Sequence, residues 1–220
     1  MKSGLSRELI ALRVAKEFED GYYVNLGIGL PTLVSSFIPE GIDVTLHSQN
    51  GILGYGRIAN EEEMDPDLIN AGSQPVTLNP GATFFDSAEA FAMIRGGHID
   101  VVVLGAFQVS ERGDLANWMT LERKVGSIGG SMDLVNGAKK VIVAMEHTSR
   151  SGEPRIVKEC TYPLTGRGVV NLVVTNLAVI EVTPEGLLLK EVAPSVTPEE
   201  VQAVTQPKLK LAGELKEIVL

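Results

Sequence analysis

The chain alternates short, wholly apolar runs with amphipathic stretches that end at glycine. Val101–Leu104 and Val141–Ala144 are two such runs, and neither carries a polar face. A strand that is apolar at every position must be covered on both faces, which is typical of parallel sheets between layers of helices. The helix expected over Asp86–Ile94 ends at Gly96-Gly97 and leads into the first of these runs. This alternation predicts an α/β fold with an open, mostly parallel sheet flanked by helices.

The remaining elements follow the same pattern. Further helices are expected from Ser6 to Gly21, over Thr32–Phe37, over Met132–Asn136 and from Pro198, and further strands over Tyr22–Leu26, Asp43–Leu46, Leu172–Thr175, Ala178–Val182 and Leu187–Leu189. Ser6 is expected to cap the first helix, and Thr197 with Glu200 forms a capping-box pattern at the last one. No linker, repeat or low-complexity segment interrupts the pattern. Residues 1–220 are therefore predicted to form a single domain.

The composition disfavours several classes of protein. A formal net charge of -9 disfavours binding to a nucleic-acid backbone. The longest apolar runs are strand-sized, far from the roughly 20 residues that span a bilayer, so we expect no membrane partner. A single cysteine, Cys160, cannot form an internal disulfide and is typical of a reducing compartment, which predicts a cytoplasmic location. The histidines form no cluster with the spacing of metal ligands, so no metal is expected.

Glycines gather where expected strands end. The groups are Gly27 with Gly29, then Gly51, Gly54 and Gly56, then Gly126, Gly129 and Gly130. Ligands bind at the carboxyl ends of strands in open α/β sheets, where a glycine lets backbone amides approach closely. Each group taken alone is more typical of a tight turn. Gly27-Ile28-Gly29 also lacks the third glycine of a dinucleotide-binding fingerprint, because Thr32 occupies that position.

The segment Ser48–Gly54 follows an expected strand directly. Its Asn50-Gly51 pair favours a turn with positive φ at both central residues. Such a bend would present Gln49 outward from the edge of the sheet. These seven residues alone favour a plain surface turn with a polar residue at its start.

Longer stretches carry a resemblance to a known family. They are Asn25–Thr32, Ser48–Gly54, Phe91–Asp100, Gly113–Met119 and Gly129–Val135. In these stretches, in this order, the chain resembles the B subunits of family I CoA-transferases, which include acetoacetate, succinyl-CoA:3-oxoacid and 3-oxoadipate CoA-transferases. The resemblance covers nearly the whole chain. It implies the α/β fold that CoA-transferases share with some sugar-phosphate isomerases.

The resemblance also implies a ping-pong mechanism. In the family, a glutamate in a Ser-Glu-Asn-Gly motif attacks the carbonyl of an acyl-CoA such as succinyl-CoA or acetyl-CoA. It then carries CoA as a thioester to a 3-oxo acid such as acetoacetate. CoA and acyl-CoA are substrates here, and no bound cofactor is expected. The position of this glutamate is Gln49. A primary amide is neutral and delocalised, so we expect this chain to have lost most transferase activity.

Two explanations of Gln49 are open. One is an engineered, isosteric and inactivating Glu→Gln change. The other is a natural non-catalytic homologue or regulatory subunit that binds acyl-CoA. The intact motifs around Gln49 favour the first. An isomerase is disfavoured, because Ser48–Gly54 offers no set of Lys, Asp and Glu for proton transfer. The sequence does not identify the acyl group.

Other site residues follow from the same resemblance. Gly130 matches a glycine whose N–H helps to form an oxyanion hole, a contribution of about 3 kcal/mol to transition-state stabilisation. The expected substrate-binding residues are Asn25, Gly27, Gly29, Asn50, Gly51 and Gly129. For Asn25, a structural role at the first glycine turn is an equal alternative. Arg123 matches a basic residue of its loop. Glu146 and His147 follow an expected strand, a position that keeps a functional role open, although a structural role is favoured for both.

The resemblance implies a partner as well. B subunits of the family act with a homologous A subunit, which is either separate or fused. This chain has no second copy of the domain. We therefore expect a separate A subunit and an oligomer, with acyl-CoA and carboxylic acids as substrates.

Overall fold

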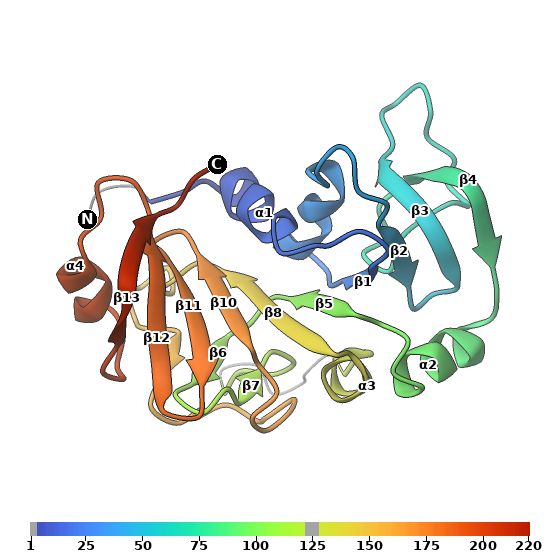
Figure 1. Ribbon diagram of the computed structural model, residues 1–220. Helices are drawn as coiled ribbons and strands as arrows, with labels where there is room; N and C mark the ends of the chain where they lie inside the picture. Colours follow the sequence, from blue (N-terminus) through green and yellow to red (C-terminus); the bar gives the residue numbers. More distant parts are fainter. Residues whose placement is uncertain (1–3, 122–127) are drawn as a thin grey trace.

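The computed structural model describes residues 4–121 and 128–220. In the centre lie β1 (Tyr23–Leu26), β2 (Thr45–Ser48), β5 (Val101–Leu104), β8 (Lys140–Met145) and β10 (Leu172–Thr175). At the flanks lie β3 (Ile52–Ile58), β4 (Val76–Phe84), β11 (Ala178–Thr183), β12 (Gly186–Val192) and β13 (Lys210–Glu217). Over the described ranges these strands form one sheet in the order β13-β12-β11-β10-β8-β5-β1-β2-β3-β4 (Figure 1).

Helices cover both faces of this sheet. The helix α1 (Arg7–Ala15) and the 3-10 helix η1 (Leu30–Ser36) lie on one face, and α2 (Ser87–Arg95) and α3 (Ser131–Gly137) on the other (Figure 1). The short helix α4 (Pro198–Ala203) packs beside β12. A small second sheet consists of β6 (Gln108–Ser110), β7 (Leu115–Ala116) and β9 (Ile156–Val157), in the order β7-β6-β9. The predicted α/β class is confirmed.

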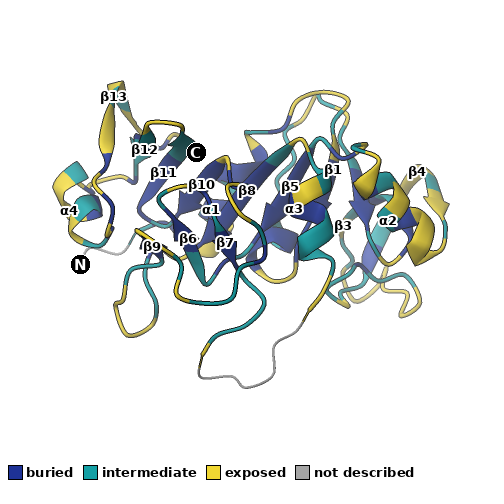
Figure 2. Ribbon diagram, turned by 90° about the horizontal axis from the view of Figure 1, so that it is seen from below, coloured by how far each residue is buried: buried dark blue, intermediate teal, exposed yellow. Residues whose placement is uncertain are grey.

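The buried centre of the sheet is parallel, and a further parallel pair, β12–β13, lies at one edge. The pairs β10–β8, β8–β5, β5–β1 and β1–β2 are all parallel, with Val24 opposite Val101 and Val103 opposite Ile142. Every residue of β5 is buried, and the central strands appear dark blue in Figure 2. The flanking pairs from β2 to β4 and from β10 to β12 are antiparallel, so the sheet as a whole is mixed. Layers of helices are needed only where strands are apolar on both faces.

The strands β3, β4 and β13 were not predicted from the sequence. The strand β3 contains Gly54 and Gly56, and β4 contains Pro80 and Gly81, all of which are unfavourable in strands. Most of β13 is exposed and shows no apolar run. Pairing with neighbouring strands, rather than local propensity, therefore sets these three elements.

The helix ends agree with the predicted caps, but two helices differ from expectation. Ser6 accepts a hydrogen bond from the Leu9 amide at 3.3 Å, and the Thr197–Glu200 capping box is present. The first helix ends at Ala15 rather than near Gly21. The helix expected at Thr32–Phe37 is a 3-10 helix that starts at Leu30, with Pro31 in its first turn. Over the described residues, no helix combines the length and apolarity needed to cross a membrane.

The parallel strands all end at the same edge of the sheet. The chain leaves β1 at Gly27, β2 at Gln49, β5 at Gly105 and β8 at Glu146. Since parallel neighbours run in the same direction, these four exits lie side by side. The architecture thus gathers loops that are far apart in sequence into one region.

Candidate active site

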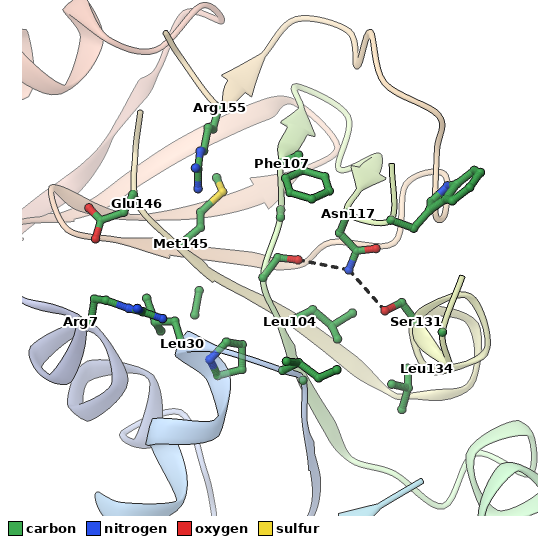
Figure 3. Close-up of a pocket in the computed structure, with 18 of the residues that line it drawn as sticks. Arg7, Leu30, Leu104, Phe107, Asn117, Ser131, Leu134, Met145, Glu146 and Arg155 are labelled. Atoms are coloured by element: carbon green, nitrogen blue, oxygen red, sulfur yellow. Dashed lines mark hydrogen bonds between the residues drawn. The ribbon is translucent and has the colours of Figure 1, made fainter. Parts of the chain in front are cut away.

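A cavity of about 880 Å³ lies at this edge of the sheet (Figure 3). Its lining includes Gln49 together with all three other strand exits, Gly27, Gly105 and Glu146. The segment Gly129–Ser131, which leads into α3, contributes a further wall. This is the place where open α/β sheets bind ligands. The cavity is therefore the candidate active site.

A tight turn between β2 and β3 positions Gln49. The Gly51 amide donates to the Ser48 carbonyl at 2.9 Å, so Gln49 is the first central residue of the turn. Gly51 has φ +113°, and a side chain there would collide with the backbone carbonyl of Phe85. Asn50 has no positive φ, so the predicted turn with positive φ at both central residues is wrong. The register of β2 and β3 shifts just before the turn, which gives a longer connection than a two-residue hairpin.

A second loop holds the outer side of this turn. Asn50 accepts from the Ser48 hydroxyl at 2.5 Å and donates to the Ile69 carbonyl at 2.8 Å. The Ala71 amide donates to the same Ser48 hydroxyl at 3.0 Å. The side chain of Asn50, expected to bind substrate, is thus engaged in structural hydrogen bonds and is not part of the cavity lining. These contacts fix the backbone on which Gln49 sits.

Asn25, which is fully buried on β1, fixes the side chain of Gln49. Its Nδ2 donates to Oε1 of Gln49 at 3.0 Å. The same Nδ2 lies 3.0 Å from Nδ1 of His47 and 3.1 Å from the His47 carbonyl. Because the His47 carbonyl can only accept, the donor nitrogen of residue 25 lies on this side and faces residue 49. None of these bonds reaches the first glycine turn, which was the alternative role of Asn25.

His47 contacts the side chain of Asn25 and is uncharged. Burial lowers the pKa of His47 to about 4, while the backbone carbonyl of Ala90 opposes this effect. Since Nδ1 accepts from Asn25, the ring proton must sit on Nε2. Within the described residues, Nε2 of His47 and Oδ1 of Asn25 are buried without a hydrogen-bond partner. The polar pair is therefore under-satisfied, which is a feature common at functional sites.

Gly130 lies directly against Gln49. A Cβ atom at position 130 would lie 3.7 Å from Cγ of Gln49 and 2.9 Å from the ring of Phe91. A side chain at position 130 would collide with Phe91, whereas its contact with Gln49 would be an ordinary one. A Cβ at the neighbouring Gly129 would meet no atom within 4 Å. A side chain is therefore excluded by its neighbours at position 130 but not at position 129.

Asn117 also lines the cavity. Its Nδ2 donates to the Gly105 carbonyl at 3.2 Å and to the Ser131 hydroxyl at 3.4 Å (Figure 3). Its Oδ1 accepts from the Thr165 hydroxyl at 2.7 Å. Asn117 therefore ties the exit of β5 to the start of α3. Asn117 lies in the family-like stretch Gly113–Met119, but no role was expected for it.

His147 has the structural role that was predicted. Its ring lies between the hydroxyls of Thr175 and Thr205, with nitrogen–oxygen distances of 2.9 and 2.8 Å. Burial lowers its pKa to about 4, so the ring is neutral. These bonds connect the exit of β8 to the end of β10 and to the segment after α4. Glu146, by contrast, is exposed and lines the cavity.

The structure brings together part of the predicted site. The cavity is lined by Gly27, Gln49, Gly129 and Gly130, whereas Gly29, Asn50 and Gly51 are not part of its lining. Asn25 lies beneath Gln49 and contacts it directly. Gly126 and Arg123 lie outside the described residues. The sequence analysis missed the arginines at the other end of the cavity, Arg7, Arg150 and Arg155, because no motif links residues so far apart.

Comparisons with known proteins agree with this arrangement. The family model "Coenzyme A transferase" matches residues 7–203, so the chain belongs to the coenzyme A transferase family. The chain is 50% identical over 205 residues to the B subunit of the succinyl-CoA:3-ketoacid coenzyme A transferase of Helicobacter pylori, covering 93% of this chain and 99% of that protein. It is 52% identical over 202 residues to the B subunit of the 3-oxoadipate CoA-transferase of Pseudomonas putida, covering 91% of this chain and 94% of the relative.

A solved structure shares the fold. The acyl-CoA transferase YdiF apoenzyme of Escherichia coli O157:H7 superimposes with a TM-score of 0.78 at 20% identity. The match covers 98% of this chain and 43% of that one. The predicted CoA-transferase fold and the resemblance to B subunits are therefore confirmed.

Proposed function

We propose that this chain is the B subunit of a 3-oxoacid CoA-transferase and that Gln49 suppresses its covalent chemistry. The substrates would be an acyl-CoA, such as succinyl-CoA or acetyl-CoA, and a 3-oxo acid such as acetoacetate. The similarity to the B subunits of transferases for 3-ketoacids and 3-oxoadipate supports this substrate class. The reaction requires no resident cofactor, because a protein carboxylate can carry the acyl and CoA groups.

The hydrogen bond between Asn25 and Gln49 carries the proposal. It holds Oε1 at the bottom of the site and thereby leaves the other terminal atom of residue 49 for the cavity. In a glutamate this second atom is an anionic oxygen, which can attack a thioester carbonyl and expel the CoA thiolate. In Gln49 it is the amide nitrogen, whose lone pair is delocalised. An acyl group attached to that nitrogen would also be a poor donor to the returning thiolate.

The remaining parts of the site suit acyl transfer. Gly130 brings its backbone against residue 49, where an N–H could stabilise the oxyanion of the attacked carbonyl. Asn25 would donate to a carboxylate as it does to the amide, and this would keep the pKa of the carboxyl low. Both features suit a reactive carboxylate at position 49. The chain as written would then bind acyl-CoA and turn it over slowly.

A homologous A subunit is part of the proposal. Ile28 lines the cavity and is 68% exposed, and Leu121 and Ile128 are 67% and 70% exposed. Large apolar side chains with this exposure are typical of interfaces between subunits. We place the A subunit over this mouth of the cavity, where it would exclude water from the reacting groups.

The second candidate function is that of a non-catalytic subunit that binds acyl-CoA. The intact cavity and the intact hydrogen bond to Gln49 suit this role equally well, since both concern binding. The two candidates differ in whether a carboxylate at position 49 would find the rest of the machinery in place. Restoring the carboxylate therefore separates them.

The test is CoA exchange between acetoacetyl-CoA and succinate, measured on the chain together with its A subunit. We expect Gln49→Glu to raise the rate by about 10³-fold or more, because it supplies the missing nucleophile. Gln49→Ala is the matched control and should stay as slow as the unsubstituted chain. Mass spectrometry should detect a CoA thioester on the Gln49→Glu variant alone. Equal rates for the unsubstituted chain and the Gln49→Glu variant would refute the proposal.

A further inference from the structure

Arg155 is a half-buried cation at the end of the cavity remote from Gln49. Its backbone is fixed, since its amide donates to the His147 carbonyl at 3.2 Å and its carbonyl accepts from Val109 at 2.9 Å. Its guanidinium, however, makes no hydrogen bond or ion pair with any described residue. Burial lowers the pKa of Arg155, and Glu146 only partly opposes this effect. Leaving a desolvated cation unpaired is costly, so an anionic ligand would relieve a cost already present.

Two more arginines share this end of the cavity. Arg7 reaches the cavity from α1 and Arg155 from the residue just before β9, on opposite sides (Figure 3). Arg150 also lines the cavity, from the turn closed by the bond of the Ser149 amide to the Glu153 carbonyl at 2.8 Å. None of the three forms an ion pair with a described residue, and Glu146 is the acidic residue among the lining side chains. The local charge is therefore positive in a chain whose net charge is -9.

The spacing of the strands indicates which anion this site would meet. Gln49 leaves β2, and the arginines surround the exit of β8, three strands away in the order β2-β1-β5-β8. At about 4.8 Å per strand, the two ends of the cavity lie roughly 14 Å apart. The second carboxylate of a short diacid lies only a few bonds from the reacting carbonyl and is too close. The pantetheine arm of CoA is much longer and ends in phosphate groups.

We propose that Arg155, Arg7 and Arg150 form a cationic subsite that binds the phosphate groups of CoA while the thioester lies at residue 49. The proposal rests on the proposed function, because the subsite would bind the phosphate end of the same acyl-CoA substrate whose thioester end reacts at residue 49. Arg155 is the central residue, since it is fixed at its backbone and partly desolvated. Guanidinium groups suit phosphate because they donate two parallel hydrogen bonds.

The test is calorimetric binding of CoA and of pantetheine, which lacks the phosphates, to the full-length chain. We expect Arg155→Gln to weaken CoA binding roughly tenfold, the loss expected for one charge-assisted hydrogen bond, and to leave pantetheine binding unchanged. Arg155→Lys should keep part of the affinity. Arg167→Gln is the matched control, since Arg167 is exposed and does not line the cavity. Thermal unfolding of each variant shows whether the fold is intact.

Several outcomes would overturn the subsite. Arg155→Gln could bind CoA as tightly as Arg167→Gln does. It could also weaken the binding of CoA and of pantetheine equally, which would indicate that Arg155 only shapes the cavity. In the Gln49→Glu variant with its A subunit, Arg155→Gln could raise KM for succinate but not for acetate, which would assign the arginine to an acyl carboxylate. All these results would leave the proposed function standing. If the unsubstituted chain bound no CoA at all, the proposed function and the subsite would fail together.

Discussion

Nδ2 of Asn25 on β1 lies 3.0 Å from Oε1 of Gln49, across the gap between two parallel strands. The donor belongs to a fully buried residue whose orientation is set by His47, so the bond leaves one terminal atom of Gln49 for the cavity. Everything that a ligand meets at position 49 therefore depends on the chemistry of that one atom.

Removing the donor at position 25 should disable a restored nucleophile. In the Gln49→Glu background, Asn25→Asp would place two carboxylates within hydrogen-bond distance and raise the pKa of the carboxyl at position 49. We expect CoA exchange to fall by about a hundredfold near neutral pH, and the acid limb of the pH–rate profile to move to higher pH. Asn60→Asp makes the same chemical change on an exposed loop and should alter neither. An unchanged profile for the Asn25→Asp variant would contradict the role of this bond.

Gly130 and Gly129 allow a paired comparison within one segment. Gly130→Ala would push its Cβ toward the Phe91 ring and displace the backbone that faces residue 49, whereas Gly129→Ala would enter open space. In the Gln49→Glu background we expect Gly130→Ala to lower kcat at least about tenfold, because a misplaced oxyanion donor loses most of its effect. Gly129→Ala should stay close to the parent rate. Equal kcat values for the two variants would argue against a role for Gly130.

The turn that carries Gln49 should tolerate no side chain at position 51. Gly51→Ala combines φ +113° with a collision with the Phe85 carbonyl. Gly81→Ala is the matched control, since φ is +88° there but a Cβ meets nothing within 4 Å. Backbone strain alone costs about 1–2 kcal/mol, so we expect Gly81→Ala to lose about that much free energy of unfolding and Gly51→Ala to lose clearly more. Urea denaturation measures both, and similar losses would contradict the steric argument.

The fold should begin to lose stability at pH values higher than those at which carboxylates become protonated. His47 and His147 have folded pKa values of about 4 against an ordinary value of 6.5, because burial disfavours their charged forms. The unfolded chain therefore binds protons that the fold excludes, and the free energy of unfolding decreases as the pH falls from about 6.5 to about 4.

His147→Gln should reduce this dependence. The slope of the free energy of unfolding against pH is proportional to the number of protons taken up on unfolding. Near pH 5.5, this number should fall from about two to about one. Denaturant titrations at several pH values give the slopes, and an unchanged slope in the His147→Gln variant would show that His147 is not buried in neutral form.

Local signals explain which elements could be predicted. The strands at Val101–Leu104 and Val141–Ala144 are apolar at every position, and the caps at Ser6 and Thr197 depend on neighbouring residues only. The strands β3 and β13 depend on pairing with distant segments, and their own residues are poor strand formers or exposed. The turn at Asn50-Gly51 was misassigned because its length depends on how β2 meets β3.

The sequence by itself determined that the chain is an α/β protein of the coenzyme A transferase family, and that Gln49 stands where the family-like motif has a glutamate. Both follow from patterns within short stretches of the chain. Only the tertiary structure decided that Asn25 holds Oε1 of Gln49, that Asn50 is not part of the cavity lining, and that Arg7 and Arg155 line the far end of the cavity. The physical reason is that parallel strands bring distant segments to one edge, where hydrogen bonds and unpaired charges depend on spacing that no local pattern encodes.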